Sequence, residues 1–512
     1  MQRPLCAILS SFALASTLAQ AQERNPQFSG STALSTSSAG TTIVRLLQQS
    51  HDLDQQLPVS MRLNMLSRQA LMVYKLRADL GREWANELFT LSFHAKEGHR
   101  TVAQGTAMSV LIRLDPDRAL ELLHRISMEE PEANWSTTPP KLEIAQHVFQ
   151  VLAERDGERV LPVLEQEAEN MGKEGHYPYA ALGFAASRAS DKYWGNNNEH
   201  AVQLLQSIFE RAFARYRQNM RGYFDDFQFA RMLEVLSGGL PFDSVQPALR
   251  LLVKNLLATD TRKYQFVAEA YTTDGESTKT DNVIDATVMV FGMLINRDPE
   301  LVRELESSRP ELKTVLEYTK EGRLSSLVGP GRPEDMRSED PATETRMDAI
   351  GLSPSNPEAA IAKAEQMPDD KRAGTMLEVA RGMAGDHAER AAELIAETQS
   401  KNPLTDDEMQ FNSISAQASV AAAQNKKDEL HELLQRGFAS GNGILLEQQR
   451  SDDIHFFPGL GLMIQIGIQN DSDLTTAFME SLPTSYVKAE AYFIAASALN
   501  MGRRLPFSSR QQ

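Results

Sequence analysis

Three stretches of similar sequence indicate the fold of this chain. They read LPVSMRLNMLSRQA at residues 57–70, MPDDKRAGTMLEVA at 367–380 and LPTSYVKAEAYFIAA at 482–496. In each stretch an apolar residue and a proline precede a basic residue and, farther on, an alanine. Proline suits the first turn of a helix because its missing N–H costs nothing there, and a later alanine lets a neighbouring helix approach closely. We therefore predict a repeated helical unit, with Arg62 and Arg372 on its exposed side.

A second phrase begins the expected partner helix. Residues 115–123 read DPDRALELL, residues 386–395 read DHAERAAELI, and residues 298–305, DPELVREL, form a weaker copy. Aspartate at the cap, proline at the first helical position and glutamate in the first turn are a common helix-start chemistry. Part of this similarity is therefore expected of any helix start, and the order of the two phrases carries more weight.

With these phrases the chain resembles bacterial helix-hairpin repeat proteins of the tetratricopeptide type, as a class. The likeness is carried by three small residues and two helix starts, at Ala70, Ala380, Ala496, Arg118 and Arg390. It covers about half of the chain, and residues 130–300 fit it poorly. The resemblance implies a right-handed α-solenoid of stacked helical hairpins, in two segments, and it names no ligand.

Most of the chain has the apolar spacing of amphipathic helices. Apolar residues recur three and four positions apart, and the breaks fall at Pro, Gly, Asp and Asn. The spacing predicts helices at residues 59–77, 82–95, 101–114, 116–128, 142–155, 201–217, 224–236, 245–257 and 283–295. We find no alternating apolar and polar runs joined by a tight turn, so no strands are expected. The predicted fold is all-α.

The N-terminal residues have the pattern of a secretory signal. Arg3 precedes an apolar run of about 14 residues, and Ala19-Gln20-Ala21 offers the small residues of a cleavage site. The run is too short to span a bilayer, so we expect a signal peptide at residues 1–21, cleaved after Ala21. Residues 22–41 are rich in Ser, Thr, Gly and Ala, as in a flexible leader.

A chain of this length exceeds one hydrophobic core, so a domain boundary is expected. The run VGPGRPED at residues 328–335 combines helix breakers with charge. We place a linker at residues 325–343 between an N-terminal helical-repeat domain, 42–324, and a C-terminal one, 344–505. Residues 506–512 form a tail.

Charge and cysteine content restrict the partners and the compartment. Removing residues 1–21 takes away one positive charge, that of Arg3, and moves the formal net charge from −17 to −18. Such a charge repels phosphate backbones and anionic lipids, so we expect neither nucleic acid nor membrane as a partner. The only cysteine, Cys6, lies in the signal, which leaves the exported chain without a thiol. We expect a periplasmic or extracellular protein.

Metal and cofactor motifs are not found. No nucleotide-binding glycine loop, nucleophile elbow or His-Glu-x-x-His motif occurs. His94 and His99 are five positions apart, which would turn them to different sides of a helix, and zinc needs three or four convergent ligands. Residues 274–281 have oxygen ligands without EF-hand spacing, so we interpret them as a polar loop between helices, with calcium as the alternative. No cofactor is expected.

An aromatic cluster is the first candidate binding site. Tyr177, Tyr179, Tyr193 and Trp194 surround a region between two expected helices, and an amide-rich stretch ending in His200 follows. Aromatic faces beside amides can stack on sugars or hold peptides. The alternative, which we favour, is a corner of the core.

A pair of carboxylates is the second candidate. Tyr223 precedes Asp225 and Asp226, and residues 452–457 offer a distant echo. Paired carboxylates can act as the acid and base of a glycosidase if they face each other across a cleft. Neighbours on a helix diverge by about 100°, so we favour helix capping or a solvated face.

Two function classes follow from these features. The first is a non-catalytic scaffold whose stacked helices bind another exported protein or a peptide. The second is an all-α polysaccharide lyase or hydrolase of the α/α-toroid kind, with its cleft at one of the two clusters. We prefer the scaffold because no convincing acid and base pair is present.

Overall fold

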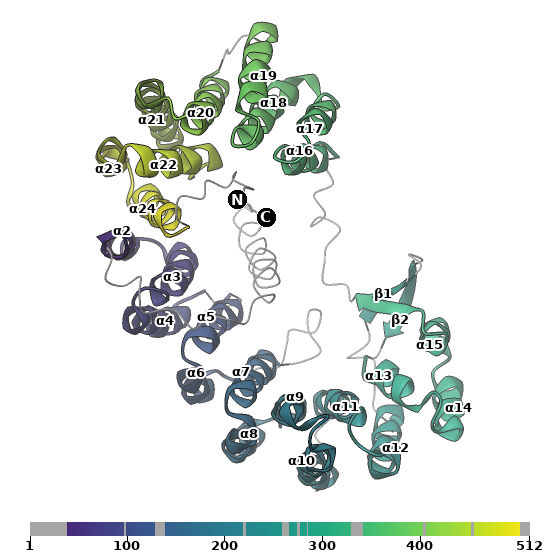
Figure 1. Ribbon diagram of the computed structural model, residues 1–512. Coiled ribbons are helices and arrows are strands. Elements are labelled where there is room, and N and C mark those ends of the chain that lie inside the picture. The colour runs from purple at the N-terminus through teal and green to yellow at the C-terminus, as the bar shows by residue number, and fades with distance from the viewer. Residues whose placement is uncertain are drawn as a thin grey trace.

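A computed structural model gives the architecture of the chain (Figure 1). It describes residues 38–96, 99–128, 139–218, 222–258, 266–273, 277–283, 285–328, 341–402, 406–451 and 455–501. The predicted signal peptide, the tail and the leader up to residue 37 lie outside this described part.

Helices make up most of the described chain. Up to the sheet they are α2 (Ser38–Asp54), α3 (Val59–Tyr74), α4 (Ala78–Ser92), α5 (Arg100–Leu114), α6 (Pro116–Leu122), α7 (Pro140–Asp156), α8 (Leu161–Glu174), α9 (Tyr179–Ser190), α10 (Asn198–Gln218), α11 (Tyr223–Ser237) and α12 (Phe242–Ala258). After it come α13 (Asp285–Leu294), α14 (Pro299–Ser308), α15 (Lys313–Lys320), α16 (Pro341–Leu352), α17 (Pro357–Ala364), α18 (Asp369–Met383), α19 (Ala388–Lys401), α20 (Asp407–Ala423), α21 (Lys427–Arg450), α22 (Pro458–Asn470), α23 (Ser472–Ser481) and α24 (Ser485–Asn500).

The predicted helices are all present, and the all-α class is confirmed for the bulk of the chain. The largest difference is in the helix predicted at 116–128, where α6 ends at Leu122 and a 3₁₀ turn follows. Two predicted caps are also confirmed, because the Asp115 and Asp298 side chains accept hydrogen bonds from the backbone N–H of Arg118 and Leu301. Asp386 is not a cap, because α19 begins at Ala388 and His387 occupies the cap position.

A small sheet interrupts the helices, and the sequence did not predict it. Strands β1 (Phe266–Thr272), β2 (Ser277–Val283) and β3 (Leu324–Val328) form an antiparallel sheet in the order β2-β1-β3. The polar loop predicted at 274–281 is therefore wrong from Ser277 onward. Of the linker predicted at 325–343, residues 325–328 belong to β3 and residues 341–343 to α16, and those between lie outside the described part.

The helices form two rows along a curved path (Figure 1). Within the first row each helix packs on the members before and after it, and each second-row helix packs on first-row neighbours. The first row, here called the inner row because it lies nearer the centre in Figure 1, comprises α3, α5, α7, α9, α11 and α13, and also α16, α18, α20, α22 and α24. The outer row comprises α2, α4, α6, α8, α10, α12 and α14, and also α17, α19, α21 and α23.

The two ends of the described chain pack on each other. Helix α2 lies against α24, in the outer-row place that follows α24, and α3 continues the inner row beyond it (Figure 1). Ser50 Oγ donates to the carbonyl oxygen of Ala489 over 2.7 Å. Arg68 forms an ion pair with Glu490 and lies over the ring of Phe493, 4.7 Å from its centroid. The helix rows therefore run without a break from α16 through α24 and α2 to α13.

The hydrophobic core follows this path across the chain ends. One continuous cluster includes buried side chains from Ile43 to Leu316 and from Phe411 to Ala498. A second cluster joins α16, α17, α18 and α19 to one face of α20. The predicted domains 42–324 and 344–505 thus share one core where α2 meets α24.

Residues of the repeated phrases occupy matching places. Ala70, Ala380 and Ala496 are fully buried on inner-row helices α3, α18 and α24. Pro58 and Pro368 precede their helices with nearly the same backbone angles, φ −54° and ψ 146° against φ −51° and ψ 147°.

The two arginines at the helix starts also match. Arg118 and Arg390 lie on outer-row helices, and the Nε of each donates to a side chain 32 positions earlier, that of Asn86 or Glu358. Each also pairs with the glutamate three positions on.

The predicted exposure of Arg62 is wrong. Its side chain is 18% exposed and is held between the carboxylates of Asp54 and Glu87. Arg372 is the more exposed of the pair, at 43%, and it contacts Asp369 in its own first turn. The difference arises because α2 and α4 flank α3 and supply the buried Asp54 and the partly buried Glu87, whereas the ion pair of Arg372 is with an exposed acid of its own helix.

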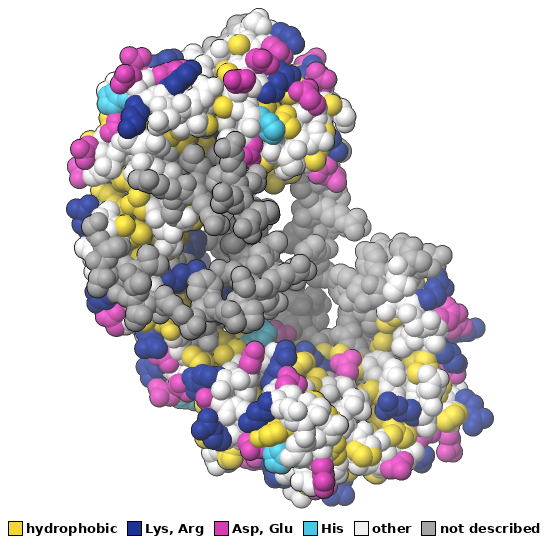
Figure 2. All heavy atoms as spheres, viewed as in Figure 1, with side chains coloured by type: hydrophobic (Ala, Val, Ile, Leu, Met, Phe, Trp, Pro, Cys, Tyr) yellow, Lys and Arg dark blue, Asp and Glu magenta, His cyan; other side chains and the backbone are white. Residues whose placement is uncertain are grey.

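The surface is of mixed charge. In Figure 2, Lys and Arg side chains alternate with Asp and Glu over the visible face, without a large area of one sign. Among the described residues, no helix has the length and apolar character needed to cross a membrane.

The α2–α24 contact predicts a mutational effect that joins distant segments. Ala489 is fully buried, so an Ala489→Asp change places an unpaired carboxylate in this contact, at a cost of several kcal/mol. We expect faster amide hydrogen exchange in α2 as well as in α24, and a melting temperature lower by several degrees. Asn500→Asp, at the exposed end of the same helix, is the control and should change neither. Faster exchange confined to α24 would contradict the contact.

Candidate functional site

The side chains that the sequence singled out fall into two groups at opposite ends of α9. The first group, near its start, comprises Tyr177, Tyr179, Asp225 and Asp226. The second group, after its end, comprises Tyr193, Trp194 and His200. The 12 residues of α9 rise about 18 Å, so the two groups do not form one site. Tyr223 begins α11, and its side chain lies outside the described part.

Tyr177 and Tyr179 are packing residues of the core. Tyr179 is 1% exposed, and its ring packs edge-on against Tyr216 and Phe229 with centroids 5.8 and 5.4 Å away. The guanidinium of Arg215 lies 4.4 Å from the centroid of Tyr177. Burial raises the pKa of both phenols, so both are neutral. These tyrosines therefore occupy the corner of the core that was the alternative to a binding role.

Asp226 belongs to a buried polar network that joins α10, α11 and α12. Its Oδ1 accepts a hydrogen bond from the Tyr216 hydroxyl over 2.5 Å, and that hydroxyl accepts one from Asn255 Nδ2 over 2.8 Å. Burial raises the pKa of Asp226 to about 6, although the hydrogen bond from Tyr216 acts in the opposite direction. The network joins three helices through Tyr216 and Asp226, which are buried, and Asn255, which is partly buried.

Asp225 is buried as well, so the predicted capping role or solvated face is wrong. It is 2% exposed, and its Oδ1 lies 3.5 Å from His176 Nδ1. Its other oxygen has no hydrogen-bond partner among the described residues. Gly222 holds the cap position of α11, with no side-chain capping bond. The physical reason is that α9, α10, α12 and α13 pack around α11, which places its first turn inside the core.

The two carboxylates do not form an acid and base pair. Asp225 faces His176 on the segment before α9, whereas Asp226 faces Tyr216 on α10. A glycosidase pair faces a sugar across an open cleft, with several ångströms between the carboxyl groups. Here both groups are enclosed by packed helices. Their chemistry is that of buried polar contacts between helices.

The second group is a small surface cluster. The rings of Tyr193 and His200 meet edge-on at 4.4 Å, and His200 Nε2 lies 2.8 Å from Glu158 Oε2. Hydrogen bonds from His200 and Tyr193 lower the pKa of Glu158. Trp194 is 39% exposed and packs against Gly239, where an added Cβ would lie 3.0 Å from the indole ring.

Sequence reasoning missed a group of side chains on the inner row. We name it the Arg231 patch, and it comprises His147 on α7, Phe184 on α9, and Phe227, Arg231 and Glu234 on α11. The outer row covers one side of α9 and α11, and inner-row neighbours cover their flanks. Side chains of these two helices that reach solvent must therefore lie on the inner side. Phe227, Arg231 and Glu234 have the spacing of one helix face, but this spacing does not distinguish a binding residue, and His147 and Phe184 come from other helices.

The electrostatics of this patch are dominated by one guanidinium. Arg231 lies over Phe184 and Phe227, 5.7 and 5.9 Å from their centroids. Burial lowers the pKa of His147, and the positive charge of Arg231 lowers it further. Burial raises the pKa of Glu234, and Arg231 partly offsets this effect. His147 and Glu234 are exposed, Phe184 and Arg231 are partly exposed, and Phe227 is buried, so the patch is an open surface that carries a cation.

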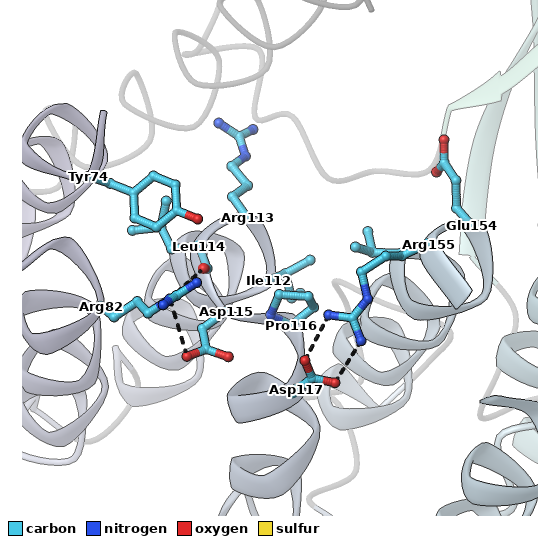
Figure 3. A pocket seen from close by; sticks show the side chains of 11 residues that line it. Tyr74, Arg82, Ile112, Arg113, Leu114, Asp115, Pro116, Asp117, Glu154 and Arg155 are labelled. Atoms are coloured by element: carbon cyan, nitrogen blue, oxygen red, sulfur yellow. Dashed lines mark hydrogen bonds and ion pairs between the residues drawn. The ribbon is translucent and has the colours of Figure 1, made fainter. Parts of the chain in front are cut away.

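An open depression of about 490 Å³ lies at the ends of α3, α5 and α7 (Figure 3). Two ion pairs cross it, Arg82 with Asp115 at 3.7 Å and Arg155 with Asp117 at 2.7 Å. Asp115 also caps α6. In Figure 3, Arg113 extends away from both pairs. Most of the charged side chains that line the depression are already paired between helix ends. We therefore interpret the depression as a structural junction.

No metal centre is found in the described ranges, where no three His, Cys, Asp or Glu side chains are placed to hold an ion. Comparison with models of known families, with curated proteins and with solved structures found no match to this chain. The functional argument therefore rests on the chain's own geometry.

The buried Asp226 predicts a pH-dependent effect of Asp226→Asn. The pKa of Asp226 in the folded chain, about 6, is above its ordinary value of 3.8, so the folded state loses stability as pH rises between these values. The amide keeps an acceptor for Tyr216 and removes the charge. We expect the variant to be more stable at pH 7.5, by about 1 to 3 kcal/mol, and the gain to shrink at pH 4.5.

Thermal melts at both pH values measure this effect. Asp243→Asn changes an exposed carboxylate in the first turn of α12 and serves as the control, with no comparable gain. A loss of stability in Asp226→Asn at pH 7.5 would show that the charge itself is needed.

Proposed function

We propose that the protein is an exported, non-catalytic scaffold that binds another exported protein or a peptide on its inner row. In this proposal the two rows are a right-handed α-solenoid of stacked hairpins. Export rests on the signal-like residues 1–21, with cleavage after Ala21 and release into the periplasm or the medium.

The arrangement of the rows carries this proposal. The free sides of successive inner-row helices turn toward the same central space (Figure 1). Stacked helical hairpins that curve in this way present an extended concave surface, and such surfaces bind extended or folded partners. An exposed stripe along several neighbouring helices suits a long ligand better than a small one.

The matching positions of the repeated phrases also support stacked units. Three alanines of the phrase are buried on the inner row, and the two arginines of the second phrase make the same two contacts on the outer row. Equivalent contacts at equivalent places are expected of a repeated structural unit.

The buried state of the two aspartates favours binding over catalysis. Asp225 and Asp226 were the best acid and base candidates, and both are occupied in packing. A lyase or hydrolase would need other residues that converge on an accessible cleft. The Arg231 patch offers one partly exposed cation beside aromatic rings, which is a recognition surface rather than an acid and base pair.

Site-specific photocrosslinking tests the proposal. A benzophenone side chain at Ser187, which reaches solvent on the inner-row helix α9, should crosslink to a defined partner in the native compartment. The same group at Gln206, on the outer-row helix α10, is the matched control and should give little product. Equal crosslinking at both positions, or none at inner-row positions, would contradict a partner on the inner row.

A further inference from the structure

The Arg231 guanidinium has no ion pair among the described residues and lies over aromatic rings, as those of Arg125 and Arg217 also do. Other arginines of the adjacent helices form ion pairs, for example Arg188 with Asp191 at 3.5 Å and Arg215 with Glu169. Arg231 forms no ion pair or hydrogen bond with any described residue and contacts the rings of Phe184 and Phe227 instead. Its guanidinium carries five N–H donors, which phenyl rings do not consume.

The position of this arginine is set before any ligand binds. Phe227 is 5% exposed and belongs to the core, so the ring beneath the guanidinium is fixed. Phe184 is half-buried on the neighbouring helix, one residue after Gly183. A Cβ at Gly183 would lie 3.0 Å from the Met232 side chain, so α9 and α11 approach closely there. This close approach brings the ring of Phe184 on α9 next to the guanidinium of Arg231 on α11.

We propose that Arg231 binds a carboxylate side chain of an extended peptide segment, with an apolar neighbour of that carboxylate packed on Phe184. This inference rests on the proposed scaffold function and specifies its ligand. A planar guanidinium matches a carboxylate with two parallel hydrogen bonds. A doubly charged phosphate is disfavoured, because one cation is available and the protein as a whole is strongly acidic.

The neighbouring charges fit a single carboxylate. Glu234 is the closest acid of the patch on α11, and it forms no ion pair with Arg231. His147 faces the site from α7, where its lowered pKa keeps it neutral near pH 7, so it can act as a hydrogen-bond donor or acceptor. The surface from α7 across α9 to α11 is about 16 to 20 Å wide. This width equals the length of five or six extended peptide residues.

Peptide pairs that differ in one charge test this inference on the chain beginning at Gln22. The probes are fluorescent nine-residue peptides with a central Leu-Glu-Leu or Leu-Gln-Leu, measured by anisotropy up to millimolar concentration. We expect the Glu form to bind at least about tenfold more tightly than the Gln form. Arg231→Gln should abolish the difference, and Arg231→Lys should retain part of it.

The matched control is Arg217→Gln, which removes another arginine that lies over a single ring, that of Phe213 on the outer row, and should leave the difference intact. Melting curves of each variant exclude unfolding as the cause. Equal binding of both probes by the unsubstituted chain, or an unchanged preference in Arg231→Gln, overturns the inference. Preferential binding of oligogalacturonate over the Glu probe would overturn the peptide assignment.

The same data separate this inference from the scaffold proposal. If Ser187 crosslinks to a partner in the native compartment while Arg231→Gln does not weaken that product, the scaffold proposal stands and the carboxylate site falls. If the Glu probe binds through Arg231 but no inner-row crosslink forms, the carboxylate site is supported and the proposal of a macromolecular partner is contradicted.

Discussion

The packing of α2 against α24 is the contact on which the rest of the architecture depends. Ser50 and Ala489, which meet there, are 439 positions apart in sequence. Bringing such distant segments together costs about 5 kcal/mol of chain entropy. Ile43, Leu46 and Leu47 are at most 4% exposed, and burial of each contributes roughly 1.5 to 3 kcal/mol. The contact is therefore large enough to hold the two chain ends together. The helix rows are interrupted in the middle of the sequence and not at the chain ends.

Buried charge beside this contact sets how α2, α3 and α4 fit together. Asp54 is fully buried, neither oxygen has a hydrogen-bond partner among the described residues, and Arg62 Nε lies 3.6 Å away. Burial raises its pKa to about 6. Burial acts in the same direction on Glu87, but hydrogen bonds from His51 and Gln55 outweigh it and lower that pKa to about 2. Asp54 thus favours folding at low pH, and Glu87 favours it above about pH 4.5, so the two effects oppose each other.

The sequence predicted local features well because they depend on near neighbours. Helix positions, the Asp115 and Asp298 caps and the buried Ala70 all follow from spacing of three to four residues or from the chemistry of one turn. The sheet was missed because β2, with the sequence STKTDNV, has no alternating apolar residues. The dipeptide Asp274-Gly275 before it was the hairpin signal that could have revealed the strand pair. Contacts across 400 positions leave no local pattern, so the joining of the chain ends was not predictable.

The residues of the Arg231 patch were not among the predicted site residues. Asp225 and Asp226 were predicted as a candidate pair, and their burial was missed because two acids in a first helical turn usually cap or face solvent. The surrounding sequence, YFDDFQFARMLEVLS at residues 223–237, has apolar residues on every side of the helix, which favours an embedded helix. Asp225 and Asp226 are buried in it, whereas Glu234 is exposed. Arg231 was missed because a lone arginine carries no signal until its neighbours in space are known.

The burial of Asp226 explains why Arg231 faces the centre. A helix that is apolar all round has no preferred rotation from hydrophobicity alone, whereas a buried polar contact specifies one. Asp226 bonds to Tyr216 on α10, so this side of α11 must face the outer row. Arg231 is five residues further on, about 140° around the helix at 100° per residue. The hydrogen bond of Asp226 on the outer side of α11 thus sets the position of Arg231 on its inner side, although these two side chains do not contact each other.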